Sequence, residues 1–462
     1  MADGSHPLIR PPAAPSNGFF VRRETCQTMS APEHEEETPV LPLTKLIGMG
    51  GFAGYLLLGI EVMRVASIRG RSAAEYDQVD GSALLQVAYV GLCALYGFHR
   101  WLRSPQRGAF HLLKTSPLLP LVVYTILCGL STLWSQNPPI TLYRSVECMA
   151  YIVLAAVVCD NLNLRCSPQD FIEWLIFWGA WFYVWDALRM VRIMGPSVLI
   201  SRFAFRFGNF GLSMVFFLAL FVSRRRILSV PTVLCTVLST ANVTYFGILF
   251  GLAPGLCVGD RRYRIALFFL AGLGALSFLT MGSEVVHHTL FYGKEGVGIE
   301  HTTGRDRIWR YCMDYGMERF LYGYGFVAGE TEALGVTGVR AITTHNVFLS
   351  AFLSVGIAGP LLFVLFFAWL ASLSFHSDIP MNWRPAFLGM TIMLFITSFA
   401  SPGLGARVYG AWLPAALVSA AISVLANRER LIQMNMDGQG VEVLPGLRGC
   451  QPASGGFGFA DD

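Results

Sequence analysis

The sequence has few charged residues for its length. Asp, Glu, Lys and Arg together make up 14% of its 462 residues, whereas apolar residues make up 54%. Soluble globular domains usually carry about 25% charged residues, so this chain has little charge with which to cover a water-exposed surface. The mean hydropathy is positive. Composition therefore predicts a chain that lies mainly in a lipid bilayer.

Several functional motifs are absent from the sequence. Neither a G-x-x-x-x-G-K-[ST] loop nor a G-x-G-x-x-G turn after a strand occurs, which argues against ATP-driven transport. No Cys/His set with metal-ligand spacing and no D-x-D pair occurs in the segments expected outside the membrane, so we expect neither a metal nor another cofactor. The net charge of +4 is modest, and nucleic acid is not an expected partner.

Both ends of the chain are polar. Residues 1–43 are rich in Pro and Glu and lack the short apolar core and small-residue cleavage site of a signal peptide. Residues 428–462 are rich in Gly, Pro and Ser. Both segments are predicted to be disordered tails.

Long apolar runs fill most of residues 44–427. Because every backbone amide in hydrocarbon must be paired within its own segment, apolar runs of about 20 residues are expected to be helices. The predicted fold is an all-α polytopic membrane protein with about twelve spans. Residues 227–259 contain either two short spans or one broken span, and we prefer two. The predicted spans are 46–62, 83–99, 117–134, 141–159, 171–188, 209–223, 227–243, 245–259, 265–282, 346–375, 386–402 and 409–426.

Lys and Arg residues in short loops predict the orientation, since they resist translocation. Four basic clusters fall on one side of the twelve-span arrangement, and we expect that side to be cytoplasmic. Both termini are then cytoplasmic, and residues 283–345 form a long outer loop. Cys312 is the one cysteine expected outside, so no outer disulfide is predicted. Residues 64–71 carry arginines that fit this orientation poorly. The four clusters are 99–114, 224–226, 261–264 and 428–430.

Few ionisable residues lie within the predicted spans. Glu147 is the deepest, and Arg144 lies three residues before it on the same helical face. A local ion pair is the simplest interpretation. A role in an outward-facing cavity is the alternative, because charge in lipid is costly and tolerated mainly for function.

Two outer stretches carry arginines. Arg202 and Arg206 are spaced i, i+4, so that a helix would present both guanidiniums on one face; alternatively they are anchors at the lipid headgroups. Thr303 and Asp306 form a T-x-x-D pattern, which predicts that a helix begins there. Arg305 in its first turn suits a phosphate group, or else it caps a surface helix beside lipid phosphates. An apolar stripe suited to the membrane surface or the bundle follows at Ile308, Trp309, Cys312, Met313 and Met317.

His345 and Asn346 open the tenth predicted span at its outer end. Residues 345–375 as one helix would measure about 46 Å, which is longer than a bilayer requires, so we predict a break at Gly356, Gly359 and Pro360. By residue type alone, a lone histidine at this place is more often an interface residue than a catalyst.

Four short motifs, in this order, resemble those of the bacterial O-antigen ligase and O-antigen/exopolysaccharide polymerase family. The resemblance covers roughly residues 117–375. In that family an R-x-x-G-x-F-x-x-P-N sequence often precedes the sixth span, whereas here Phe205 replaces the Gly, which leaves open whether Arg202 or Arg206 matches. The motifs are Trp134-Ser135 with Pro138 or Pro139, Leu142 and Arg144; Thr303-Gly304-Arg305 with Ile308-Trp309; Gly323-Tyr324-Gly325; and His345-Asn346 with Leu349, Gly356 and Gly359.

The resemblance implies a metal-independent, inverting glycosyltransferase of the bacterial inner membrane. It would transfer glycan from an undecaprenyl-pyrophosphate carrier to a glycan hydroxyl at the periplasmic face, with His345 as general base. Arg305, with Arg202 or Arg206, would stabilise the pyrophosphate leaving group, and Arg144 and Asn346 would help to bind substrate.

Alternative functions stay open. The motifs favour a polysaccharide polymerase slightly over an O-antigen ligase acting on lipid A core. A chain-length regulator is a further expected partner of a polymerase. An alternative of another class is a small-solute or ion transporter, since the chain consists mostly of predicted helix bundle.

Overall fold

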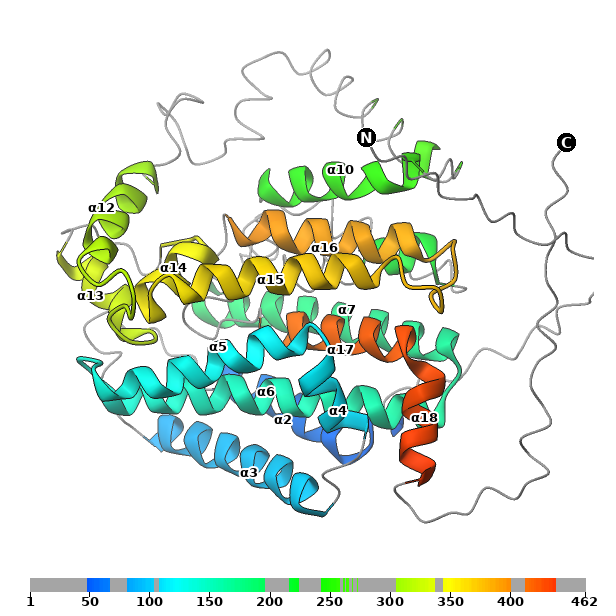
Figure 1. The fold of residues 1–462 in the computed structure, drawn as a ribbon, viewed down its shortest axis with the longest axis horizontal. Coiled ribbons are helices and arrows are strands. Elements are labelled where there is room, and N and C mark those ends of the chain that lie inside the picture. Colours follow the sequence, from blue (N-terminus) through cyan, green and yellow to red (C-terminus); the bar gives the residue numbers. More distant parts are fainter. Residues whose placement is uncertain are drawn as a thin grey trace, which may run out of the picture. The chain divides into compact units, whose positions relative to one another are not determined.

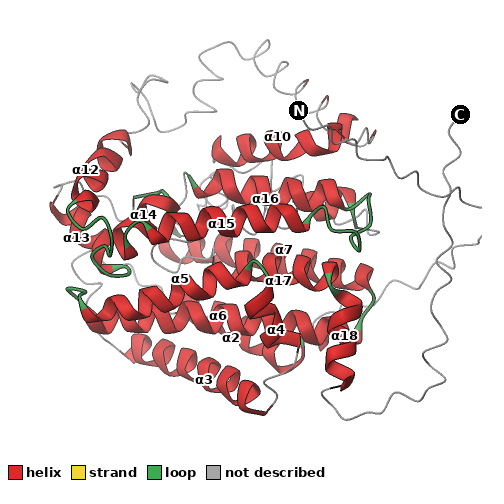
Figure 2. Ribbon diagram, viewed as in Figure 1, coloured by secondary structure: helices red, strands yellow, loops and turns green. Residues whose placement is uncertain are grey.

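A computed structural model shows which predicted spans form helices. All its described residues belong to one unit, Leu41–Asp462, and every regular element among them is a helix (Figure 2). The all-α prediction is therefore confirmed for this part of the chain. The described residues are 48–66, 81–103, 108–195, 216–223, 242–257, 305–336, 344–399 and 412–437, with six further residues between 261 and 272.

The helices follow the predicted apolar runs closely. Their bounds are α2 Gly51–Ala66, α3 Gly81–Arg103, α4 Gly108–Thr115, α5 Leu118–Leu130, the short 3-10 helix η2 Ser131–Leu133, α6 Pro138–Arg165, α7 Pro168–Met194, α10 Asn242–Cys257, α12 Arg305–Met317, α13 Ala328–Val336, α14 Val347–Val355, α15 Ala358–Leu373, α16 Arg384–Ser398, α17 Trp412–Ala426 and α18 Arg428–Asp437.

The length and hydropathy of the described helices test the span count only in part. Within the described ranges, one segment, Pro138–Leu164 of α6, is long and apolar enough to cross a membrane by itself. Gly108–Thr115 and Leu118–Leu133 would provide a second span if the pair, bent by 80°, is counted as one. Parts of α10, α15, α16 and α17 are apolar but shorter. Nearly all of predicted span 227–243, about half of 209–223 and most of 265–282 lie outside the described residues, so twelve spans stay a prediction.

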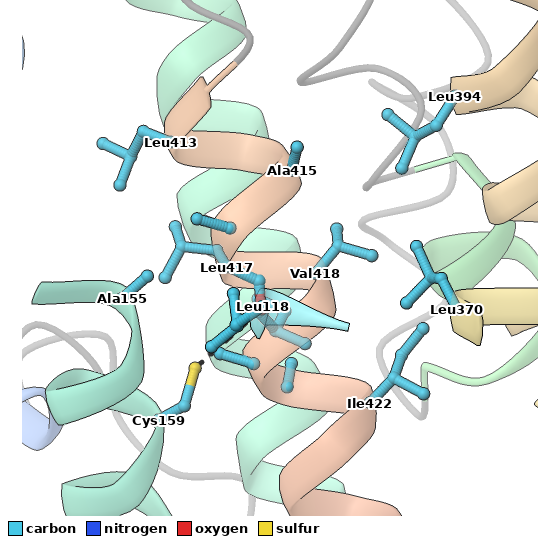
Figure 3. Packing of buried hydrophobic residues seen from close by; sticks show 14 of the residues in the cluster. Leu118, Ala155, Cys159, Leu370, Leu394, Leu413, Ala415, Leu417, Val418 and Ile422 are labelled. Carbon is cyan, nitrogen blue, oxygen red and sulfur yellow. Dashed lines mark hydrogen bonds between the residues drawn. The ribbon is translucent and has the colours of Figure 1, made fainter. Parts of the chain in front are cut away.

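Helix α6 lies at the centre of the apolar packing, in contact with α2, α3, α4, α5 and α17. Figure 3 shows side chains from several helices in one buried cluster, including Leu118 of α5, Cys159 of α6 and Leu417 of α17. Helix α17 is built of small and apolar residues that are all buried. The hydroxyl of Ser419 donates to the carbonyl of Ala415 in the same helix at 2.8 Å, which satisfies a buried polar group without a partner helix.

Helices α10 and α16 lie side by side (Figure 1). Glycines allow their backbones to approach closely: a Cβ atom on Gly389 would lie 2.4 Å from the carbonyl oxygen of Gly251, and one on Gly251 would lie 2.7 Å from that of Gly389. Small residues at a helix contact are typical of helices that pack within a membrane.

The predicted break in residues 345–375 is confirmed. Helix α14 ends at Val355, Gly356 adopts a φ of 70°, and α15 begins at Ala358. A side chain at position 356 would lie 2.4 Å from the carbonyl carbon of Leu321. The Ile357 N–H donates to the Phe320 carbonyl at 2.9 Å. The break is therefore fixed by the turn at residues 318–325 that packs against it.

The prediction for the C-terminal tail is corrected. Residues 428–437 form helix α18, whereas residues 428–462 had been assigned to a disordered tail. Arg428 donates to the Cys166 carbonyl at 2.8 Å, and Leu431 is fully buried. These tertiary contacts, together with packing on α4 and α6, stabilise a segment whose own sequence is mostly polar. The other predicted tail, residues 1–43, lies outside the described residues.

Candidate functional site

The junction between α5 and α6 meets the turn between α12 and α13. Thr141 Oγ1 donates to the Phe326 carbonyl at 2.9 Å, and the Phe326 N–H donates to Ser131 Oγ at 3.1 Å. Trp134 Nε1 donates to the Tyr322 carbonyl at 3.1 Å. Figure 1 shows α12, α13 and α14 gathered at this end of α5 and α6. We call this region, comprising α12–α14, the α12–α13 turn and the α5–α6 junction, the α12–α14 end.

The two glycines of the G-Y-G motif are required because segments of the backbone approach one another closely at this end. Gly325 has a φ of 106°, and a Cβ on it would lie 2.6 Å from the Cβ of Ser135 in the W-S motif. Gly323 has a φ of 65°, and a Cβ on it would lie 2.7 Å from the Leu353 carbonyl oxygen. The Gly325 N–H donates to the Ser354 carbonyl of α14 at 3.0 Å. Glycine alone fits both the conformation and the space.

Arg305 is the first described residue of helix α12, and the expected cap at Thr303 lies outside the described residues, so the start of this helix at Thr303 stays a prediction. Trp309, one turn after Arg305, donates from Nε1 to the Thr344 carbonyl at 2.7 Å. The T-G-R-x-x-I-W motif is therefore attached to the residue that directly precedes His345. The guanidinium of Arg305 is half-buried.

The predicted apolar stripe of α12 divides between two environments. Ile308 and Cys312 are buried in a small cluster with residues of α13 and α14, whereas Met313 and Met317 are exposed. One side of the helix therefore packs on the protein, and the other side is available for a membrane surface. Burial raises the pKa of the Cys312 thiol to about 12, so this thiol stays protonated at neutral pH.

His345 adopts an unusual backbone conformation. Its φ of 54° lies in the left-handed region, where a residue other than glycine carries about 1–3 kcal/mol of strain that surrounding contacts must offset. The next residue, Asn346, caps α14: its Oδ1 accepts from the N–H groups of Phe348 at 3.0 Å and Leu349 at 3.1 Å. The side-chain oxygen of Asn346 thus has a structural role, and substrate binding by this residue stays a prediction.

A buried carboxylate lies beside this segment, and the sequence reasoning missed it. Glu330 of α13 is 1% exposed. Its Oε1 lies 2.6 Å from the Thr344 amide nitrogen and 2.9 Å from the hydroxyls of both Thr344 and Ser350. A glutamate within the short, largely apolar helix AGETEALGV was the available signal.

Arg144 and Glu147 form the predicted ion pair in α6. Arg144 Nη1 lies 2.7 Å from Glu147 Oε2. Glu147 is buried and also accepts from Gln86 of α3 at 3.4 Å and from the Tyr151 hydroxyl at 3.3 Å. The guanidinium lies 5.1 Å from the centroid of the Tyr143 ring. The local interpretation is confirmed, and a substrate-binding role for Arg144 stays a prediction.

Aromatic and charged side chains surround the G-Y-G turn. Tyr315 and Tyr324 stack with centroids 4.3 Å apart, and the Arg319 guanidinium lies 4.5 Å from the Tyr324 ring centroid. The Tyr315 hydroxyl donates to Glu332, as does Gln136 Nε2 at 2.5 Å. Burial is the largest of the causes that raise the pKa of Tyr324 to about 12; the next is a hydrogen bond to the Glu318 carboxylate.

The positions of two predicted site residues are not described. Arg202 and Arg206 are outside the described residues, so their positions relative to His345 stay predictions. Across the described part of the chain, no three His, Cys, Asp or Glu side chains are grouped in a way that could hold a metal ion. The chain matches no protein-family model and no curated protein sequence.

Proposed function

We propose that this chain is a polytopic glycosyltransferase of the bacterial inner membrane, of the polysaccharide polymerase type. It would transfer glycan from undecaprenyl pyrophosphate to a glycan hydroxyl at the periplasmic face. One observation carries the proposal: residues of all four motifs come together at the α12–α14 end. The W-S motif contacts the G-Y-G turn, the G-Y-G turn contacts α14, and Trp309 is bonded next to His345. Parts of the chain up to 195 residues apart in sequence are brought together.

The ends of α6 support the proposed orientation. Thr141, near its first residue, binds Phe326 of the predicted outer loop, whereas Cys166, just after its last residue, binds Arg428 of a predicted cytoplasmic basic cluster. Helix α6 has 28 residues, which corresponds to about 42 Å. A bilayer with its headgroups is about 40–45 Å thick, so the two contacts are separated by one membrane thickness.

The proposed reaction is a single displacement at the anomeric carbon of the donor sugar. His345 removes the proton from the acceptor hydroxyl as its oxygen attacks. The bond between the anomeric carbon and the phosphate oxygen breaks, and its electron pair leaves with undecaprenyl pyrophosphate. Arg305, with Arg202 or Arg206, neutralises the charge that develops on this leaving group. The configuration at the anomeric carbon inverts.

Transfer by the purified chain in liposomes tests this proposal. A lipid-linked repeat unit should be lengthened, with release of undecaprenyl pyrophosphate, in the presence of a metal chelator. His345→Ala should lower the rate by about 10²–10⁴-fold, and Arg305→Lys should also lower it, because lysine lacks the planar fork that binds phosphate at two oxygens. His376→Ala and Arg310→Lys are matched controls, since His376 lies in the α15–α16 loop and Arg310 is exposed on α12.

The alternatives have different outcomes in the same assay. Transfer to lipid A core alone would identify a ligase. Solute uptake that persists in both site variants, without glycan transfer, would identify a transporter and overturn the proposal. Loss of transfer on chelation would show that the metal-independent mechanism is wrong.

A further inference from the structure

We infer that Glu330 is a positioning residue that holds His345 in its left-handed backbone conformation. This inference rests on the proposed function, because it gives the strained conformation of His345 a catalytic purpose. Glu330 has no counterpart among the four motifs. It contacts the residues on either side of the His345–Asn346 pair.

The contacts fix the chain before His345 on both sides of Thr344. Glu330 Oε1 accepts from the Thr344 N–H at 2.6 Å, while the Thr344 carbonyl accepts from Trp309 Nε1 at 2.7 Å. That carbonyl belongs to the peptide group that joins Thr344 to His345, so Trp309 sets the plane of this peptide. A rotation about the Thr344 backbone would break at least one of these bonds.

The contacts also fix the chain after His345. Asn346 caps α14, and Ser350, one turn into that helix, lies 2.9 Å from Glu330 Oε1 through its hydroxyl. The hydroxyls of Thr344 and Ser350 lie 2.6 Å apart. One carboxylate oxygen therefore joins α13, the segment before His345 and the first turn of α14. His345 lies between two anchored residues, which is the condition for a strained φ to persist.

The residue type at position 330 suits this role. An ionised carboxylate only accepts hydrogen bonds, so its oxygen matches an N–H and two hydroxyls at once, and bonds to a charged acceptor are stronger than neutral ones. Burying a carboxylate is costly, and Glu330 is almost completely buried. A glutamine here would keep the shape but lose the charge, which makes Glu330→Gln the informative substitution.

Two measurements on the purified, full-length chain test the inference. The first is the kinetics of glycan transfer: Glu330→Gln should lower kcat by about 10²-fold, the size of effect expected when a catalytic group is misplaced by about 1 Å. The KM for the lipid-linked donor should change by less than about 3-fold, because ground-state binding is retained. Loss of a purely structural contact would not separate kcat from KM in this way.

The second measurement does not depend on the substrate. Diethyl pyrocarbonate is reacted with the folded protein, and modification of His345 is measured by mass spectrometry. The rate of this modification should differ between wild type and Glu330→Gln. The rate at His376, in the α15–α16 loop, should not. Thr344→Val and Ser350→Ala remove single hydroxyls from the network and should change the His345 rate in the same direction. If Glu330→Gln does not fold, the inference is tested with these two variants instead. Thr331→Val is the matched control, because Thr331 is exposed and its hydroxyl donates to the carbonyl of Val327, the residue just before α13.

The outcomes separate this inference from the proposed function. A wild-type chain that transfers no glycan overturns the proposed function. The His345 modification rate would still report on the contacts that Glu330 makes around His345. A folded Glu330→Gln variant with wild-type kcat and a wild-type His345 rate overturns the inference. A changed His345 rate with unchanged kcat would show that Glu330 constrains the histidine without serving catalysis, which also overturns it.

Discussion

The contact between α6 and α17 and the α12–α14 end both bury hydroxyl groups, but they satisfy them in different ways. In α17 the hydroxyls of Ser419 and Ser423 each donate to a carbonyl one turn earlier in the same helix. At the α12–α14 end, Thr344 and Ser350 bind a carboxylate from another helix, Glu330. The packing of α17 therefore depends only on the volumes of its side chains. The arrangement at the α12–α14 end depends on particular partners that must be placed together.

The backbone shows the same difference. Helix α17 is regular throughout its fifteen residues. At the α12–α14 end, two residues other than glycine, Val327 and His345, have φ values of 65° and 54°, and Gly323, Gly325 and Gly356 also have positive φ. Proteins tend to violate local structural rules at functional sites and to offset the cost elsewhere. We therefore expect the apolar contact to stabilise the fold and the strained end to serve the proposed function.

Gly356→Ala should cause the largest loss of stability. The new methyl group would lie 2.4 Å from the Leu321 carbonyl at a φ of 70°, and the combined strain and overpacking should cost about 4 kcal/mol. Thermal unfolding in detergent, followed by tryptophan fluorescence, measures the effect. Gly91→Ala in α3 is the control, since no atom lies within 4 Å of its new methyl group; it should gain up to about 1 kcal/mol. Equal unfolding midpoints for the two variants would contradict the packing described for the break.

Leu417→Ala should destabilise the apolar contact without altering the site. Leu417 of α17 is fully buried in the apolar cluster, and α17 packs on α6. Truncation of Leu417 should cost about 3 kcal/mol through lost packing and the cavity left behind. Glycan transfer per folded molecule should equal that of wild type at a permissive temperature. Leu365→Ala, at an exposed leucine of α15, should change stability by less than about 0.5 kcal/mol. A lowered kcat in Leu417→Ala would show that the two regions are coupled.

Alkaline pH should destabilise the α12–α14 end through Tyr324. Its pKa is about 12 in the folded protein and about 10 in an unfolded chain. Above pH 10 the unfolded state therefore binds fewer protons than the folded state, so stability falls as pH rises and is fully present below pH 10. The loss should reach about 2 kcal/mol at pH 12.

Unfolding midpoints between pH 9 and pH 12 measure this effect. Tyr324→Phe should flatten the decline, although its stability at neutral pH will be lower because bonds to Tyr315 and Glu318 are lost. Tyr322→Phe keeps Tyr324 and should retain the wild-type slope. Identical slopes in wild type and Tyr324→Phe would remove Tyr324 as the cause.

Features with a local cause were predictable from the sequence. The break at Gly356 follows from glycines and a proline in an overlong apolar run. The pairing of Arg144 with Glu147 follows from their i, i+3 spacing. In each case the residues that determine the structure lie within a few positions of one another.

Features with a tertiary cause were not predictable. Glu330 of α13 bonds to Thr344 and Ser350, contacts that no periodicity in the sequence specifies. Arg428 of α18 bonds to the carbonyl of Cys166, 262 positions away. Composition predicted a tail there because α18 is polar by itself. The resemblance supplied the order of the motifs, but their spacing in sequence did not indicate that they meet.

A matched pair of threonines gives the smallest and most direct test of the comparison. Thr141 and Thr125 are both buried. The Thr141 hydroxyl donates to Phe326, 185 residues away, whereas the Thr125 hydroxyl donates to Leu121 in its own helix, each at 2.8–2.9 Å. Valine has nearly the same shape in both places. Thr141→Val removes the bond to the Phe326 carbonyl and also the contact with Ser135 Oγ at 2.8 Å, and should cost about 1–2 kcal/mol. Thr125→Val removes one bond within its own helix and should cost less than about 0.5 kcal/mol, because the Leu121 carbonyl also accepts a helical N–H.

The two threonine variants should also differ in function. Thr141→Val loosens the G-Y-G turn beside the proposed site, so glycan transfer should fall more than the loss of folded protein explains. Thr125→Val should transfer glycan at the wild-type rate per folded molecule. If both variants lose the same stability and the same activity, hydrogen bonds between distant segments matter no more at the α12–α14 end than bonds within a helix. The division between a stabilising contact and a functional end would then be wrong, because it rests on that difference.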